Sequence, residues 1–300
     1  MAAAALVAVA LWYVVAMPGS AYRGALEFSA DEKALAARLR AHVETLAAGE
    51  RNVDLERAAG YIARELGSVR EHAFASGGRT VRNIETGAGS IVVGAHYDSV
   101  PGSPGADDNA SGVAVLIELA RMGLPARFIA FANEEMPYFE TEEMGSQVWA
   151  REAARRGERI SAMLSLEMLG YYRDAPGTQH YPPPFGWLYP DRADFIGFVG
   201  DLGARRLVRR AIDAFRRHAR FPSEGVAAPA FVPGVTWSDH WSFRRHGYAA
   251  IMVTDTAFNR YPHYHQPSDT PEKLDYERMA KVTLGLAAML GELSTEHQYR

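Results

Sequence analysis

Short apolar segments of strand length alternate along this chain with longer stretches in which apolar residues recur at helical spacing. Such an alternation is typical of a layered α/β fold with a largely parallel sheet. Helices are predicted at 29–48, 55–66, 110–122, 145–156 and 276–290, the first with Ser29 as its N-cap. Strands are predicted at 80–86, 90–95, 127–132, 160–169 and 248–253.

One segment, residues 174–234, interrupts this alternation. It contains three consecutive prolines at 182–184, several aromatic residues and a basic helix near 205–220. A long Pro- and aromatic-rich insertion in a compact domain is usually either functional or flexible. We therefore expect this insertion to lie near the functional site, and its basic helix to present a solvated face.

Residues 2–17 form an apolar run without a charge. A membrane-spanning helix needs about 20 apolar residues and a signal-peptide core about 7–15, so the run falls between the two. Small residues, Gly19 and Ala21, follow it as at a cleavage site, although no basic residue precedes it. The alternative is a buried Ala-rich core helix.

We expect residues 1–21 to be a signal peptide or a membrane anchor that is not part of the folded domain, residues 22–300. The domain is then expected outside the cytoplasm, periplasmic or secreted, and to meet a membrane only through this anchor.

Composition narrows the chemistry. The chain has no cysteine, which excludes disulfides, thiolate nucleophiles and cysteine-bound metals. Its 32 basic and 36 acidic residues give a net charge of −4, so no nucleic-acid partner is expected. A metal ion would have to be held by histidines and carboxylates.

His96 and Asp98 follow the apolar strand predicted at 90–95. Side chains two positions apart on an extended strand share a face, so Asp98 can accept a hydrogen bond from the imidazole of His96. Alone, the pair is weak evidence, because structural histidines beside acids are at least as common.

Further carboxylates and histidines lie near the ends of the other predicted strands or just before the helices predicted at 110–122 and 276–290. In open α/β sheets, functional residues gather beyond the carboxyl ends of strands, so these side chains are expected to converge. Nitrogen and oxygen donors of this kind suit two zinc ions. Individually, the aspartates could merely cap a helix and the paired glutamates could be solvated. The residues are Asp107, Asp108, Glu134, Glu135, Glu167, His263 and His265.

The strings at these positions resemble the co-catalytic zinc exopeptidases of metallopeptidase family twenty-eight. They are HYDS, GADDNASG, NEE, SLEM and H-x-x-x-D-T, in this order, and the resemblance covers about residues 80–290. It implies a single three-layer domain whose mostly parallel, mixed central sheet is flanked by helices. It also implies a two-zinc aminopeptidase that releases N-terminal residues from a peptide or small amide substrate.

The resemblance implies a metal-binding role for five residues. His96 and Glu167 are expected to bind one zinc ion. Glu135 and His265 are expected to bind the other, and Asp108 is expected to bridge the two ions.

It also implies roles for neighbouring residues. Glu134 matches the general base, and Asp98 matches the aspartate that lies behind the first histidine. Tyr264 is expected to donate its hydroxyl to a developing oxyanion, the alternative being a packed loop aromatic. His263 is expected to be a loop residue, and the cluster at 238–241 to be orienting or structural. Members of the family often have a cis peptide after the bridging aspartate.

Three departures from the family bear on substrate choice. Glu167 stands where many members have aspartate, residues 136–144 form a longer link that should reshape the rim of the site, and the insertion at 174–234 is additional. Two alternatives stay open: a glutaminyl-cyclase-type acyltransferase on the same scaffold, which relatives run with a single zinc, and a non-catalytic peptidase-like ectodomain.

Overall fold

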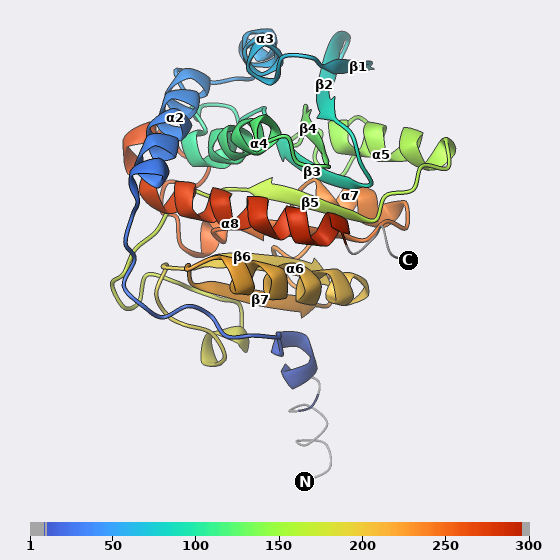
Figure 1. Cartoon of the computed structure of the whole chain (residues 1–300). Helices are drawn as coiled ribbons and strands as arrows, with labels where there is room; N and C mark the ends of the chain where they lie inside the picture. The colour runs from blue at the N-terminus through green and yellow to red at the C-terminus, as the bar shows by residue number, and fades with distance from the viewer. Residues whose placement is uncertain (1–8, 10, 296–300) are drawn as a thin grey trace.

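A mixed sheet of eight strands runs through the middle of the protein, in the order β1-β2-β4-β3-β5-β8-β6-β7 (Figure 1). The computed structural model describes residue 9 and residues 11–295. The strands are β1 (Arg70–Ser76), β2 (Arg79–Gly87), β3 (Ile91–His96), β4 (Arg127–Phe131), β5 (Ala162–Glu167), β6 (Ile196–Asp201), β7 (Ser223–Ala228) and β8 (Ala250–Thr254). The helices are α2 (Ala30–Leu46), α3 (Leu55–Leu66), α4 (Gly112–Arg121), α5 (Gly145–Arg155), α6 (Arg205–His218), α7 (His240–Arg245) and α8 (Tyr276–Thr295).

Helices cover both faces of this sheet. On one face α2, α3, α4, α6 and α8 share the larger apolar core, and on the other α5 and α7 pack together, with Trp149 stacked on Phe243. The strands β3, β5 and β8 are buried along their whole length, which explains their continuous apolar runs. The predicted three-layer α/β domain is confirmed, as is Ser29, whose hydroxyl accepts the amide hydrogen of Glu32 at the start of α2.

The segment 174–234 does not interrupt the fold as predicted, because its residues from 196 onward supply β6, α6 and β7. β6 pairs antiparallel with β8 and parallel with β7, so these strands widen the sheet. The sequence analysis did not predict these two strands, β6 and β7, because small residues interrupt their apolar pattern. A Cβ at Gly200 would lie 2.9 Å from Val208, so glycine there permits the close approach of α6. The prediction also missed β1, a largely exposed edge strand.

The described part of the N-terminal run packs against the domain from which the prediction excluded it. Residues 11–15 are helical, and Val14 and Val15 contact the apolar cluster around Phe185. Arg205 Nε donates to the carbonyl oxygen of Tyr13 at 2.8 Å, and Arg216 Nη1 donates to that of Pro18 at 2.8 Å.

Residues 1–8 and 10 lie outside the described residues, so the signal or anchor assignment stays a prediction. Among the residues that are described, no helix has both the length and the apolar character needed to cross a membrane.

Glu85 on β2 is expected to make the fold sensitive to acid. Although burial would raise its pKa, bonds from His72, Arg70 and Trp149 lower it to about 2, from an ordinary 4.5. The stabilisation is complete above pH 4.5 and is lost as the pH falls toward 2; the shift corresponds to about 3 kcal/mol. Urea unfolding of chelator-treated protein measures this loss. In Glu85→Gln, the free energy of unfolding should fall much less between pH 4.5 and pH 2 than it does in the wild type.

Glu27→Gln, at an exposed position, is the control and should unfold like the wild type at every pH. An equally steep acid dependence in Glu85→Gln would contradict the assignment.

Candidate metal centre

Five side chains that could bind a metal ion meet where neighbouring strands end; they are called the donors below. Parallel strands bring their carboxyl ends to one edge of a sheet, and the loops beyond them approach one another. The donors are His96 at the end of β3, Asp108 in the irregular turn η1 (Ala106–Ser111), Glu135 after β4, Glu167 at the end of β5 and His265 in the loop after β8.

These donors form two groups that share Asp108. In the first, His96 Nε2 lies 3.3 Å from Asp108 Oδ1 and 3.5 Å from Glu167 Oε1. In the second, His265 Nε2 lies 3.0 Å from Asp108 Oδ2 and 3.5 Å from Glu135 Oε1. Since the two oxygens of one carboxylate face different groups, Asp108 has the geometry of a bridge between two cations.

Several donor atoms have no hydrogen-bond partner in the part of the chain that is described. Both ring nitrogens of His96 and Oε1 of Glu135 are buried and lack such a partner. Buried polar atoms are costly unless something satisfies them. Imidazole and carboxylate are ordinary zinc ligands, so the residues fit that metal.

The pKa values show how much negative charge is concentrated here. Burial and the charge of Asp108 raise the pKa of Glu135 to about 7. Despite burial, the carboxylates of Glu167 and Glu134 raise the pKa of His96 well above its usual value. Asp108 and Glu135 raise that of His265 to about 10, again against the effect of burial. A divalent cation would compensate this charge.

Asp98 holds the backbone that carries the paired glutamates. Its Oδ1 accepts the amide hydrogen of Glu134 at 3.1 Å, and its Oδ2 accepts that of Glu135 at 2.9 Å. Asn133 makes this possible by turning the chain at φ 59, a left-handed conformation that asparagine tolerates better than most residues. Asp98 Oδ1 also lies 3.4 Å from His96 Nδ1, behind the histidine, where the resemblance implied.

Glu134 lies beside the donors but belongs to neither group. Its Oε2 is 3.9 Å from His96 Nε2. Burial, together with the charges of Glu167 and Glu135, raises the pKa of Glu134 well above its ordinary value, although His96 opposes the shift. Two adjacent glutamates thus have different surroundings, one within a donor group and one free to take up a proton.

The other residues singled out in the sequence have defined places. The Tyr264 ring stacks on His265, with ring centroids 3.8 Å apart. His263 Nδ1 bonds to the hydroxyl of Ser268, away from the donors. The hydroxyl of Ser238 donates to Glu167 Oε2 at 2.6 Å, which orients this carboxylate. The peptide bond after Asp108 is cis, as the resemblance implied.

Arg51 is a supporting residue that the sequence analysis missed. Its fully buried guanidinium donates to the carbonyl oxygens of Asp98 and Asp108, both at 3.0 Å, and to that of Gly105 at 2.9 Å. It therefore joins the loop after β3 to the turn that carries Asp108. A lone arginine between two helices, outside the stretch that resembles the family, gave no signal.

Asp269 supports the same turn from the other side. It accepts the amide hydrogens of Asp107 and Asp108, at 2.9 and 3.1 Å, and the hydroxyl hydrogen of Tyr261 at 2.7 Å. A signal for this residue existed, because it is the aspartate of the H-x-x-x-D-T string.

Arg51→Met is expected to weaken zinc binding by about 10–100-fold, the usual effect of removing a group that orients metal ligands. Titration of the zinc-free protein against a competing chelator measures this. Arg79→Met, at an exposed position on β2, should bind like the wild type. A folded Arg51→Met protein with unchanged zinc affinity would show that the contact positions nothing.

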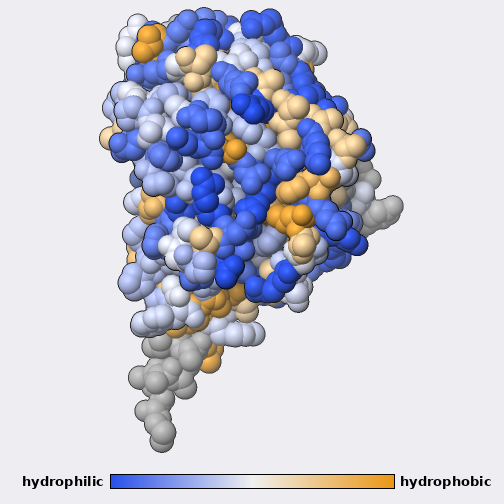
Figure 2. Space-filling model, turned by 90° about the vertical axis from the view of Figure 1, so that its left-hand side faces the viewer, coloured by the Kyte–Doolittle hydropathy of each residue, from blue (hydrophilic) through white to orange (hydrophobic). Residues whose placement is uncertain are grey.

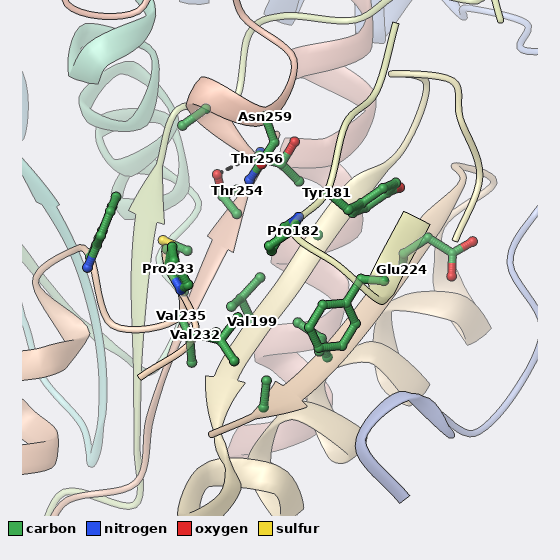
Figure 3. Close-up of a pocket in the computed structure, with 18 of the residues that line it drawn as sticks. Tyr181, Pro182, Val199, Glu224, Val232, Pro233, Val235, Thr254, Thr256 and Asn259 are labelled. Carbon is green, nitrogen blue, oxygen red and sulfur yellow. Dashed lines mark hydrogen bonds between the residues drawn. The ribbon is translucent and has the colours of Figure 1, made fainter. Parts of the chain in front are cut away.

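A cavity of about 120 Å³ adjoins the donors and extends from Glu167 and Tyr264 along β6 and β7. Figure 3 shows Tyr181 and Pro182 on one side of it and Pro233 and Val235 on the other. Its wall is mostly aromatic and aliphatic and comes largely from the segment 174–234. The loop 136–144, expected to reshape the rim, contributes no residue to the wall as far as the chain is described.

Residues 80–290 match the model of peptidase family M28. The chain belongs to this family. The chain is 44% identical over 215 residues to the uncharacterized protein YfbL of Escherichia coli (strain K12), and the match covers 67% of this chain and 66% of YfbL. It is 30% identical over 223 residues to a probable leucine aminopeptidase of Arthroderma benhamiae, covering 68% of this chain and 55% of that protein. The chain thus spans between about half and two thirds of these curated relatives.

Solved structures show the same fold. LapB from Legionella pneumophila superposes with a TM-score of 0.66 at 21% identity, covering 96% of this M28 chain and 81% of LapB. A glutaminyl cyclase from Porphyromonas gingivalis superposes with a TM-score of 0.61 at 20% identity, covering 89% and 99%. At these identities the likeness concerns the fold alone.

Proposed function

We propose that this protein is a hydrolase that holds two zinc ions and cleaves the N-terminal peptide bond of peptides or small amides. The observation that carries the proposal is the position of Asp108, whose two oxygens face two separate donor groups. Zinc bound there would supply Lewis-acid polarisation of the scissile carbonyl and a lower pKa for the attacking water.

The protein's own residues supply the proton transfers. Glu134 is close to the donors, buried, and not itself a donor, so it can accept a proton from water and return it to the leaving amine. Tyr264 lines the cavity beside Glu167 and can donate its hydroxyl hydrogen to the oxyanion.

The cavity beside Glu167 would receive the side chain of the N-terminal residue. An apolar cavity of about 150 Å³ can hold benzene, so about 120 Å³ of mostly apolar space is of the size order of one aliphatic or aromatic side chain. We expect leucyl and phenylalanyl anilides to be cleaved at least about tenfold faster, in kcat/KM, than aspartyl or lysyl anilides.

Val199→Phe, which narrows the cavity, should reduce kcat/KM for phenylalanyl substrates at least about tenfold and leave alanyl substrates nearly unchanged. Val53→Phe, at an exposed site, is the control. An equal loss on all substrates would argue against a side-chain pocket.

A second candidate is glutaminyl-cyclase-type acyl transfer, favoured by the fold shared with the Porphyromonas gingivalis enzyme. Both donor groups are complete here, the one with His96 and Glu167 as well as the one with His265. Two complete groups favour two metal ions and hydrolysis over a single-zinc cyclase. An N-terminal glutaminyl peptide distinguishes the two: hydrolysis releases free glutamine, whereas cyclisation releases ammonia. A non-catalytic role is disfavoured because all five donors and Glu134 meet at one site.

A further inference from the structure

Large apolar side chains are exposed at the end of the molecule where the N-terminal segment packs. Trp187 is 89% exposed, Phe231 86% and Trp12 67%. They come from three separate segments: η2 (Phe185–Trp187), the loop after β7 and the N-terminal helix. Exposed apolar residues that gather from distant parts of a chain usually mark an interaction surface.

A common apolar cluster joins these segments beneath the surface. Phe185 and Val235 form its centre, and Val14, Val15 and Val232 pack against it. Each of the three exposed residues, Trp187, Phe231 and Trp12, lies within two positions of a cluster residue in the sequence. In Figure 1, η2 and the N-terminal helix lie at the same end of the molecule. Figure 2 shows apolar atoms gathered at that end.

Arginines of α6 border this surface. Arg205 donates to the carbonyl oxygen of Tyr13 and its guanidinium lies 3.8 Å from the centre of the Tyr13 ring, while Arg209 donates to the carbonyl oxygen of Ala16. A carbonyl oxygen carries no net charge, so these contacts position the guanidinium groups without neutralising them. Arg206, on the next position of the helix, is exposed.

We propose that this surface, formed by Trp12, Trp187, Phe231 and the arginines at the start of α6, docks on a lipid bilayer that contains anionic phospholipids. Tryptophan and other aromatic side chains favour the interface between lipid and water. Arginines beside them are attracted by negatively charged headgroups. A second copy of the chain is the alternative partner, and sedimentation without lipid distinguishes it from a bilayer.

Docking and catalysis can be tested separately. Phe185 and Val232 line the cavity beside the metal centre, but Trp187 and Phe231 do not. Changes at these two exposed residues should therefore leave cleavage of a small soluble anilide unchanged. That unchanged activity also shows that the variant is folded. The proposal holds whether or not the chain is a peptidase.

The test is flotation of the full chain with phosphatidylcholine vesicles and with vesicles that also contain phosphatidylglycerol. The double variant Trp187→Ser/Phe231→Ser should lower the partition coefficient at least about tenfold on anionic vesicles. Arg206→Glu should weaken binding to anionic vesicles only, and added salt should do the same. Val53→Ser and Arg64→Glu, at exposed positions around α3, are the matched controls and should bind like the wild type.

Hydrogen–deuterium exchange of the full chain identifies the contact even if the apolar run binds vesicles by itself. Anionic vesicles should slow exchange of amides in 185–188 and 229–233 and leave α3 unchanged. The proposal is overturned if the protein binds no vesicles, or binds them without protection at 185–188 and 229–233. It is also overturned if sedimentation without lipid shows a dimer that the double variant dissociates.

Discussion

Asp108→Ala is expected to lose both zinc ions and to reduce peptidase activity by more than about 10³-fold. Each donor group retains only two of its three residues when this shared carboxylate is removed. Without bound metal, the polarised carbonyl and the activated water are lost together. Zinc content by mass spectrometry and kcat/KM on a leucyl anilide measure the two effects.

The control for this variant is Asp31→Ala, an exposed aspartate in the first turn of α2. It should keep the wild-type zinc content and rate. His265→Ala should lower both quantities, since this residue is a donor in the second group. Full two-zinc occupancy in either the Asp108 or the His265 variant would refute the proposed ligand set.

Glu134→Gln should separate metal binding from chemistry. Glutamine keeps the size and hydrogen-bonding capacity of the side chain but cannot accept the proton. Loss of a general base costs about 10²–10⁴-fold in rate, equivalent to about 2.7–5.5 kcal/mol of barrier. Zinc content and the thermal unfolding midpoint should stay near those of the wild type.

The neighbouring residue provides the matched comparison. Glu135→Gln makes the same chemical change one position along the chain but removes a donor oxygen that faces His265. It should lose metal as well as activity. If Glu134→Gln kept near-normal turnover, or lost zinc as readily as Glu135→Gln, the roles of the two glutamates would have to be reassigned.

Much of the fold could be predicted from sequence, because its central strands are buried on both faces. β3, β5 and β8 therefore appear as uninterrupted apolar runs, and the helices between them keep a helical period. β6 and β7 gave no such signal, since their pairing depends on small residues that admit α6. The need for glycine at position 200 in β6 is evident only in the folded structure, where Val208 lies against it.

The donors could be located for a related reason: each follows an element that the sequence identifies, and parallel strands bring such positions together. The groups that hold them in place could not. Arg51 acts through backbone carbonyls of Asp98 and Asp108, contacts that leave no pattern of residue types. The segment 174–234 was expected near the functional site and supplies most of the cavity wall. Which of its residues face one another could not be predicted, because the two sides, around 181–189 and 232–237, meet only in the folded chain.

The most direct test of the account is a zinc titration of the metal-free protein, with bound zinc and hydrolysis of a leucyl anilide measured on the same samples. The account predicts two zinc ions per chain, with full activity reached only after the second equivalent. Saturation at one zinc per chain, with full activity at that point, would contradict the shared role of Asp108 and the two-metal site built on it.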